Sequence, residues 1–268
     1  MRSNGGELAG AWNFRDVAEE TGIRPGRFFR SSELSGLDDD GRAALSSLGI
    51  TDVADLRSVR ELERRGAGQV PDGVAIHHLP FHELASSQTD APHESAFEKM
   101  VTERSDDDDV AVAAARFMTD EYLRFPSLPG AKLAVHQVIS MLADERPVIA
   151  HGFAGKDRTG FTVALVLDAV GVGRAAIVAD FLRSNDAVPQ LQERILDSIR
   201  NRASQEPTDE ILTFAEARLN EEVLGVREEY LDAAWRTIEA DYGSPAGYLE
   251  AIGVTPNQVD RLRSNLLG

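Results

Sequence analysis

The chain has 268 residues, a net charge of −17 and a hydrophobic content of 42%. Its length suits one large domain or two small ones, and its composition is ordinary for a globular protein. The acidic charge repels nucleic acid and anionic membrane surfaces, and no Lys/Arg stripe offsets it, so we expect neither as a partner. Cysteine is absent, which excludes disulfides, thiolate metal sites and a cysteine nucleophile.

Targeting segments are not evident in the sequence. No stretch approaches about 18 uninterrupted apolar residues, so a membrane span is not expected. The N-terminal stretch MRSNGGELAGAW lacks the apolar core that a secretory signal needs. We therefore expect a cytoplasmic protein, or one that is secreted without a cleaved signal peptide.

Short strands and helices alternate in the first part of the chain. The predicted strands are rich in Val, Ile or Phe and are bounded by turn residues; they are RFFRS (27–31), TDVADLR (51–57), VAIHHLP (74–80) and RPVIAH (146–151). Between the first two, LDDDGRAALSSLG predicts a helix with an Asp as its N-cap, Leu45 and Leu48 on one face, and Gly49 at its end. This alternation favours an α/β fold with a central, mostly parallel sheet flanked by helices.

Helical periodicity dominates from about residue 158 onward. The dipeptides Ser244–Pro245 and Thr255–Pro256 each place an N-cap residue before a proline at the first helical position. The last helix carries an apolar stripe of Val259, Leu262 and Leu266. We expect a single domain over residues 1–268.

Two segments lack this periodicity. Residues 86–109 are polar and acidic and predict a mobile excursion, and residues 201–209 predict a break between helices. The neighbouring histidines His77, His78 and His82 raise the question of a metal site. Adjacent residues of a strand point to opposite faces, so we do not expect one there.

The segment HGFAGKDRTG (151–160) is built like a phosphate-binding loop. A buried strand leads into a turn in which small residues let consecutive backbone N–H groups point inward. The apolar helix that follows aims the partial positive charge of its N-terminus at the same point. Arg158 can hold two phosphate oxygens in its planar fork, and Lys156 adds a second positive charge. The predicted phosphate-binding residues, where phosphate or sulfate could sit, are Phe153, Ala154, Gly155, Lys156, Asp157 and Arg158.

Other interpretations of this segment fit less well. A Walker loop needs G-x-x-x-x-G-K-[ST], whereas here Gly152 and Gly155 are too close and Asp157 follows the lysine. GVGRAA (171–176) follows a helix rather than a strand, so it does not match a dinucleotide fingerprint. The remaining alternative is an ordinary strand-to-helix turn with incidental charges.

The pattern H-x-x-x-G-K-x-R-[ST]-G resembles the signature of cysteine-dependent tyrosine and dual-specificity phosphatases, and FAGKDRTG resembles their bacterial branch. Segments along nearly the whole chain resemble the mycobacterial protein-tyrosine phosphatase B group; they are GAWNFRDVA, RSSELS, ITDVADLRS, FLRSND, VLGVREEYL and YGSPAGYL. The resemblance implies a phosphoric monoester hydrolase that needs no metal or cofactor. Its substrates would be protein phosphotyrosine and, for some members, phosphoserine, phosphothreonine or phosphoinositides.

The same resemblance implies a helical lid near residues 190–230. It would include Leu191, Ile195, Phe214 and Leu219, whose alternative role is ordinary core packing.

The chain departs from the family at one position. The residue after the histidine is the nucleophilic cysteine in the family, and here it is Gly152. In the mechanism that the resemblance implies, a thiolate attacks phosphorus while Arg158 and the loop N–H groups hold the phosphate oxygens. Glycine offers no nucleophile, and Ser31, Ser32 and Thr159 have no identified neighbouring base. We therefore predict a chain that binds phosphate but does not turn it over.

The general acid is not fixed by the sequence. Asp157 is the first candidate, because it lies inside the loop as in related bacterial enzymes; its alternative role is an ion pair with Arg158 or Lys156. Glu83 and Asp90 are second candidates. His151 is expected to orient the loop through its ring N–H, or else to be a plain histidine at a strand end.

Three hypotheses for the function stay open. The first is a phosphotyrosine phosphatase scaffold whose parent is active and whose nucleophile has been replaced. The second is a native phospho-binding pseudophosphatase, and the third is a phosphoinositide phosphatase, for which Lys156 beside Arg158 would suit a multiply charged head group. The loop otherwise keeps its phosphatase form, which favours an active parent.

Overall fold

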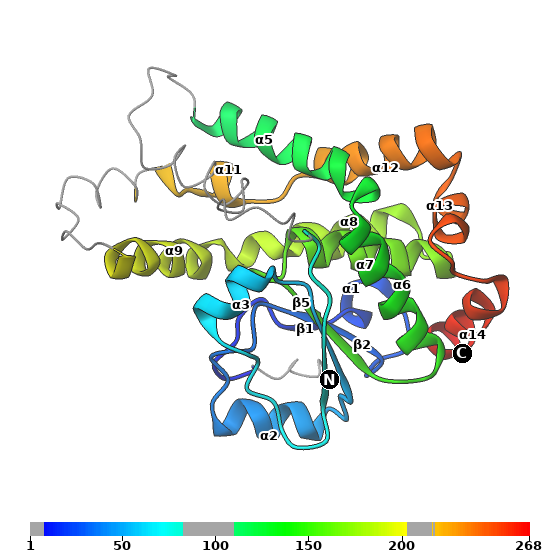
Figure 1. The fold of residues 1–268 in the computed structure, drawn as a ribbon, viewed down its shortest axis with the longest axis horizontal. Helices are drawn as coiled ribbons and strands as arrows, with labels where there is room; N and C mark the ends of the chain where they lie inside the picture. Colours follow the sequence, from blue (N-terminus) through cyan, green and yellow to red (C-terminus); the bar gives the residue numbers. More distant parts are fainter. Residues whose placement is uncertain (1–7, 83–109, 203–215, 217) are drawn as a thin grey trace.

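The computed structural model of the chain describes residues 8–82, 110–202, 216 and 218–268. In this part of the chain five strands form one sheet in the order β1-β2-β5-β3-β4 (Figure 1). They are β1 (Arg15–Asp16), β2 (Phe28–Ser31), β3 (Asp52–Asp55), β4 (Ala75–His78) and β5 (Val148–His151). The pairs β2–β5, β5–β3 and β3–β4 are parallel, while β1 and β2 are antiparallel. The mostly parallel sheet is thereby confirmed.

The four predicted strands are confirmed, with narrower bounds. Every residue of β2, β3 and β5 is buried, as expected for the central strands of a sheet that is covered on both faces. β4 lies at the edge of the sheet and is partly exposed. β1 is not predicted, because an Arg–Asp pair has no apolar pattern that could reveal it.

Helices flank the sheet, which confirms the predicted α/β architecture. In the described residues they are α1 (Ala18–Thr21), α2 (Asp39–Ser47), α3 (Val59–Arg65), α5 (Val110–Arg124), α6 (Pro129–Ala143), α7 (Asp157–Val170), α8 (Arg174–Leu182), α9 (Val188–Arg202), α11 (Glu221–Leu224), α12 (Glu228–Tyr242), α13 (Pro245–Ala251) and α14 (Pro256–Leu267). Short 3₁₀ turns, η1 (Phe125–Ser127) and η2 (Arg183–Ala187), follow α5 and α8. None of the helices in this part of the chain is long and apolar enough to cross a membrane.

The predicted helix boundaries are confirmed by their caps. In α2 the side chain of Asp38 accepts from the backbone N–H of Gly41 at 2.8 Å, and Gly49 follows with φ of +69°. Ser244 caps α13, and Thr255 forms a capping box with Gln258 at the start of α14. α5 and α6 are not among the predicted elements.

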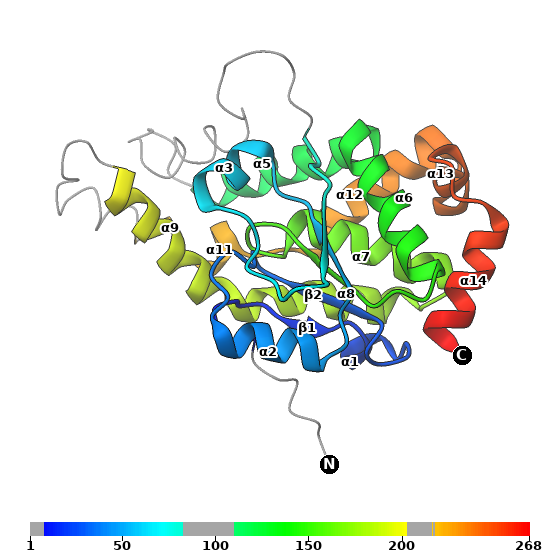
Figure 2. The ribbon, with the colours of Figure 1, turned by 60° about the horizontal axis from the view of Figure 1, so that its bottom comes forward.

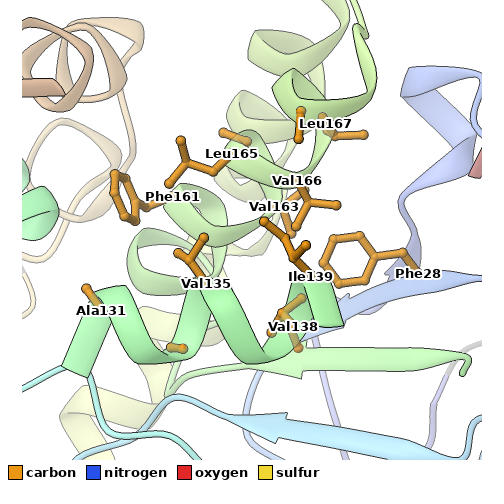
Figure 3. Packing of buried hydrophobic residues seen from close by; sticks show 14 of the residues in the cluster. Phe28, Ala131, Val135, Val138, Ile139, Phe161, Val163, Leu165, Val166 and Leu167 are labelled. Carbon is orange, nitrogen blue, oxygen red and sulfur yellow. The ribbon is translucent and has the colours of Figure 1, made fainter. Parts of the chain in front are cut away.

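Neighbouring residues of the central strands point into two separate hydrophobic clusters. Phe28 and Val148 belong to the larger one, on the side of α6 and α7. Phe29 and Ile149 belong to the smaller one, which also contains Leu45 of α2. Figure 2 shows α2 and α7 on different sides of the strands, and Figure 3 shows the side chains of α6 and α7 meeting above the sheet. This alternation is the two-residue period of a strand. Because both faces of the central strands are covered by apolar side chains, the carboxyl ends of the strands are where polar side chains can gather.

Several predictions fall wholly or partly outside the described residues. The acidic segment 86–109, the acid candidates Glu83 and Asp90, and the lid residue Phe214 all do so. α9 continues to Arg202, so the first two residues of the predicted break at 201–209 are helical, and its other residues lie outside the described ranges. The single-domain organisation stays a prediction.

Candidate active site

The HGFAGKDRTG loop lies at the carboxyl edge of the parallel strands. β5 ends at His151 and α7 begins at Asp157, so five residues connect the two elements. In the sheet His151 pairs with Ser31 of β2 on one side and with Asp55 of β3 on the other. The loop therefore sits where three parallel strands end, which is the edge at which open α/β sheets bind ligands. No side chain caps the N-terminus of α7, so its first N–H groups face the loop without a side-chain acceptor.

Two glycines of the loop have different structural roles. Gly155 has φ of +67°, and a Cβ placed on it would lie 2.0 Å from the carbonyl oxygen of Ser31. Glycine is therefore required there, by its backbone conformation and by its close approach to β2. At Gly152 a Cβ would lie 3.5 Å from Nε and 3.6 Å from Nη2 of Arg158, which is ordinary contact. The backbone at this position therefore leaves room for a Cβ, unlike that at Gly155.

Arg158 is held by Glu61, a residue that sequence analysis does not single out. Nη1 and Nη2 of Arg158 donate to Oε2 and Oε1 of Glu61 at 2.6 and 2.8 Å. The same carboxylate accepts from the backbone N–H of Ser58 at 2.7 Å, as part of a capping box at the start of α3. Burial alone would raise the pKa of Glu61, but the charge and hydrogen bonds of Arg158, with the hydrogen bonds of Ser58, lower it to about 2. The S-x-x-E pattern could have revealed the capping box but not this second partner.

The guanidinium of Arg158 has one edge toward Glu61 and another toward Gly152. Glu61 accepts from Nη1 and Nη2, whereas Nε and Nη2 are nearest to the point that a Cβ of residue 152 would occupy. A planar guanidinium presents donors along both edges. An anion in the loop would meet the Nε–Nη2 edge while Glu61 fixes the plane of the group.

Asp157 lies at the first position of α7 and has two neighbours. The hydroxyl of Tyr122 in α5 donates to Oδ1 of Asp157 at 3.2 Å. Nζ of Lys156 lies 3.7 Å from Oδ2, so the ion pair considered for Asp157 is present with Lys156. The general-acid role of Asp157 stays a prediction. Tyr122 belongs to the region that sequence analysis left unassigned, so this contact could not be foreseen.

Lys156 connects the loop to a helix far along the chain. Its Nζ also donates to the carbonyl oxygen of Leu224 in α11, and only 11% of its side chain is exposed. The ammonium therefore lies between the loop and the segment that was predicted to cover it.

His151 is completely buried at the end of β5. Its Nδ1 lies 3.1 Å from the carbonyl oxygen of Gly152 and 3.8 Å from Oδ1 of Asp55. Burial lowers the pKa of His151 more than the charge of Asp55 raises it, so the imidazole is neutral at pH 7. A proton on Nδ1 would be donated to the loop carbonyl, which is the contact that the predicted orienting role requires.

Buried polar side chains support the loop from the side of the sheet. We call Arg15, Arg30, Asp180 and Ser184 the polar support. Nη2 of Arg30 donates to the carbonyl oxygen of Gly155 at 2.7 Å, and its Nη1 lies 2.5 Å from Oδ2 of Asp180. Arg15 donates to Oδ1 of the same carboxylate at 2.9 Å. Ser184 accepts from both arginines, at 3.1 and 3.2 Å.

The charges in the polar support shift one another. Burial and the neighbouring Arg30 lower the pKa of Arg15 to about 10, against the opposing effect of Asp180. Burial would raise the pKa of Asp180, but the two arginines lower it, so the carboxylate is ionised at pH 7. The segments that contain Arg15, Arg30 and Ser184 resemble those of the phosphatase group, but their meeting beneath the loop is not predicted from the sequence.

Apolar side chains cover the opposite side of the loop. We call Val188, Leu191, Leu196, Leu219 and Leu224 the apolar cover; with Ala154 they form one buried cluster, against which Phe153 and Ile195 also pack. Phe153 meets the ring of Trp12 edge-on, with centroids 6.1 Å apart, and the guanidinium of Arg65 lies 3.9 Å from its centroid. Of the predicted lid, Leu191, Ile195 and Leu219 thus pack on the loop, whereas Val226 and Tyr230 at its end belong to the larger cluster. Lid movement stays a prediction.

The neighbouring histidines do not converge. Nε2 of His77 lies 2.7 Å from Oδ1 of Asp52, and Nε2 of His78 lies 2.9 Å from the carbonyl oxygen of Arg57. His82 lies 3.4 Å from Glu121. Within the described ranges, no three His, Cys, Asp or Glu side chains are grouped so that they could hold a metal ion.

Comparison with known proteins agrees with this geometry. A family model described as the tyrosine phosphatase family matches residues 6–268. The triple specificity protein phosphatase PtpB of Mycobacterium tuberculosis is 56% identical over 272 residues, which cover 98% of this chain and 99% of that protein. A putative tyrosine-protein phosphatase of Cupriavidus necator is 29% identical, over 91% of this chain and 78% of its own. A tyrosine-protein phosphatase of Nostoc commune is 27% identical, over 92% and 76%. The resemblance expected from the sequence is confirmed.

Proposed function

The chain belongs to the tyrosine phosphatase family. We propose that its scaffold hydrolyses protein phosphotyrosine when a cysteine stands at position 152. We propose further that the chain with Gly152 binds phosphate without turning it over. The observation that carries the proposal is the loop itself. The space at Gly152 faces the Nε–Nη2 edge of Arg158, as a nucleophile must if it is to attack a phosphorus atom that this arginine holds.

In the cysteine form each loop residue has a chemical task. The thiol at 152 would lie beside the Arg158 guanidinium and the N-terminus of α7, and both favour its thiolate. The thiolate attacks phosphorus, the phosphorus–oxygen bond to the tyrosine breaks, and Asp157 protonates the leaving phenolate. Arg158 and the loop N–H groups hold the remaining phosphate oxygens, and water then releases phosphate from the cysteine.

Loss of the thiolate affects binding and turnover in opposite directions. Turnover needs a nucleophile, and glycine offers none. Phosphate binding should become tighter, because a thiolate at about 4 Å would contribute roughly 4 kcal/mol of repulsion for each unit of phosphate charge at an effective dielectric constant near 20, before screening by ions reduces it. Glu61 holds Arg158 in the chain with Gly152, and we expect the same contacts in the cysteine form.

A native phospho-binding protein is the alternative, and Gly152 itself is the observation that favours it. Such a protein would shield a phosphorylated partner without cleaving it. The two hypotheses differ in whether the rest of the site is competent for catalysis, and only the first predicts that a single substitution restores turnover. Phosphoinositides are an alternative substrate class, for which Lys156 beside Arg158 supplies a second positive charge.

The test compares the chain with Gly152→Cys and with Gly152→Ala, which adds a Cβ but no nucleophile. We expect hydrolysis of p-nitrophenyl phosphate by the cysteine form alone, and binding of phosphate, sulfate and a phosphotyrosine peptide by all three in calorimetry. Turnover by the chain with Gly152 at an ordinary enzymatic rate would contradict the proposal. No turnover by any of them, with binding retained, would support the phospho-binding alternative. Comparing soluble inositol phosphates with phosphopeptides as substrates of the cysteine form separates the two substrate classes.

A further inference from the structure

Tyr122 is the only described side chain besides Lys156 for which a polar contact to the carboxylate of Asp157 is resolved. It lies in α5, far from the loop in sequence, and its hydroxyl donates to Oδ1 at 3.2 Å. We propose that Tyr122 is a positioning residue for the general acid, because it holds Oδ1 of Asp157 and thereby leaves Oδ2 to carry and deliver the proton. The inference rests on the proposed function and deepens it.

The ring of Tyr122 is fixed by apolar packing from several elements. Its side chain is fully buried, and its ring centroid lies 4.8 Å from that of Phe125, 5.5 Å from that of Tyr230 and 6.1 Å from that of Phe181. These neighbours come from η1, α12 and α8. A ring held on three sides cannot swing away, so its hydroxyl presents one fixed donor to the first turn of α7.

The direction of this hydrogen bond decides which oxygen of Asp157 can hold a proton. A carboxylic acid carries its proton on one oxygen and accepts hydrogen bonds on the other. Burial, and then the negative charge of Asp157, raise the pKa of Tyr122 well above its ordinary value, so the phenol is a donor throughout the working pH range. With Oδ1 occupied by that donor, Oδ2 is the oxygen that bears the proton.

The two oxygens of Asp157 have different neighbours. Oδ2 is the oxygen that lies toward Lys156, at 3.7 Å, and 22% of the Asp157 side chain is exposed. Oδ1 is engaged by Tyr122 of α5, so Oδ2 is the oxygen left to serve a leaving group bound in the loop. Among the other titratable groups, Arg30 lowers and Tyr230 raises the pKa of Tyr122, and the charge of Asp157 also raises the pKa of Tyr230.

Tyr230 is a matched control for Tyr122. It is also a buried tyrosine, its ring packs on that of Tyr122, and its hydroxyl has no hydrogen-bond partner among the described residues. Tyr122→Phe and Tyr230→Phe each remove one buried oxygen from the same aromatic group. Only the first removes a contact to Asp157.

The experiment is a leaving-group series in the Gly152→Cys chain. We expect Tyr122→Phe to lower kcat/KM by about tenfold for phenyl phosphate, whose leaving group needs a proton, and by no more than about twofold for dinitrophenyl phosphate, whose leaving group does not. Tyr230→Phe should not change the dependence on the leaving group. Phosphate affinity should be the same in both, because neither tyrosine contacts the anion-binding edge of Arg158.

Two further measurements separate positioning from general loosening of the structure. In an Asp157→Asn background Tyr122→Phe should not lower kcat/KM any further, since the carboxyl group that Tyr122 positions is gone. In the chain with Gly152, the NMR signal of the Asp157 side-chain carboxyl carbon should move in Tyr122→Phe and not in Tyr230→Phe.

The outcomes are distinguishable. If the Gly152→Cys chain hydrolyses none of the esters, the proposed function fails and this inference fails with it. If it is active and Tyr122→Phe lowers kcat/KM equally for all leaving groups, or equally with and without Asp157, the positioning role alone is overturned.

Discussion

The HGFAGKDRTG loop is held in two different ways on its two sides. Toward the sheet, the polar support fixes it with hydrogen bonds between buried charges, as in the bond from Arg30 to the carbonyl oxygen of Gly155. Away from the sheet, the apolar cover packs on Ala154 with side chains of α9 and α11. Charged hydrogen bonds are directional and define a position, whereas apolar contacts are not directional. We therefore expect the loop to depend on the polar support for its shape more than on the cover.

The largest expected effect comes from breaking the polar support. Asp180→Ala leaves two buried guanidinium groups without their carboxylate, and we expect it to lower the free energy of unfolding by about 3–5 kcal/mol. Urea unfolding measures this. Asp232→Ala, which removes the partner of Arg174 in a half-exposed ion pair, should cost less than about 1 kcal/mol. Equal effects of the two variants would show that the support is not what stabilises the loop.

The link between Glu61 and Arg158 should give the next largest effect, and one that depends on pH. The pKa of Glu61 falls from an ordinary 4.5 to about 2 on folding, which corresponds to about 3 kcal/mol in the free energy of unfolding. Because the folded pKa is the lower one, this stability is present above pH of about 4.5 and is lost as the pH falls toward 2.

Glu61→Gln should therefore be less stable than the parent at pH 7, with the difference closing as the solution is acidified. Glu63→Gln, an exposed carboxylate on the same helix, is the control and should show no such closing gap. If the difference in stability between Glu61→Gln and the parent stayed the same from pH 7 to pH of about 2, the charge of Glu61 would not be the cause of that difference.

The two loop glycines allow a comparison inside the loop itself. Gly155→Ala introduces a Cβ 2.0 Å from a carbonyl oxygen at a left-handed residue, so we expect it to cost more than about 2 kcal/mol and to abolish phosphate binding. Gly152→Ala meets only ordinary contacts and should change stability by less than about 1 kcal/mol. Thermal unfolding and calorimetry with phosphate report both quantities. If alanine were equally harmful at both positions, Gly152 would have a backbone role of its own.

The smallest expected effect concerns the cover. Asn185 holds the chain after α11 by donating to the carbonyl oxygen of Val226 at 3.0 Å and accepting from its N–H at 2.7 Å. Asn185→Ala should cost about 1–2 kcal/mol and speed hydrogen exchange around α11, while phosphate affinity changes by no more than about twofold. Asp186→Asn, at the exposed neighbour, is the control. A large loss of phosphate affinity in Asn185→Ala would show that the cover helps to shape the loop.

The parts of the site that sequence predicts are those that are contiguous along the chain. The phosphate-binding features follow one another along a short stretch of sequence: a strand, small residues, Lys156, Arg158 and a helix N-terminus. Their chemistry can therefore be predicted directly from the sequence. Glu61 and Tyr122 escape prediction because nothing in their own segments says which distant residue they contact. α6 could have been found from Ala131, Val135 and Ile139, which recur every fourth residue and are buried. α5 offers a weaker signal, since alanines fill much of its first half.

The polar support also bears on how fast an anion reaches this loop. Two buried guanidinium groups outnumber one carboxylate beneath it, within a molecule whose net charge is −17. An approaching phosphate dianion is therefore repelled at a distance and attracted at short range. Added salt screens the repulsion first, so association should quicken with ionic strength, opposite to what a basic phosphate-binding protein would show. Tight complexes at this site would owe their affinity to slow release rather than to rapid capture.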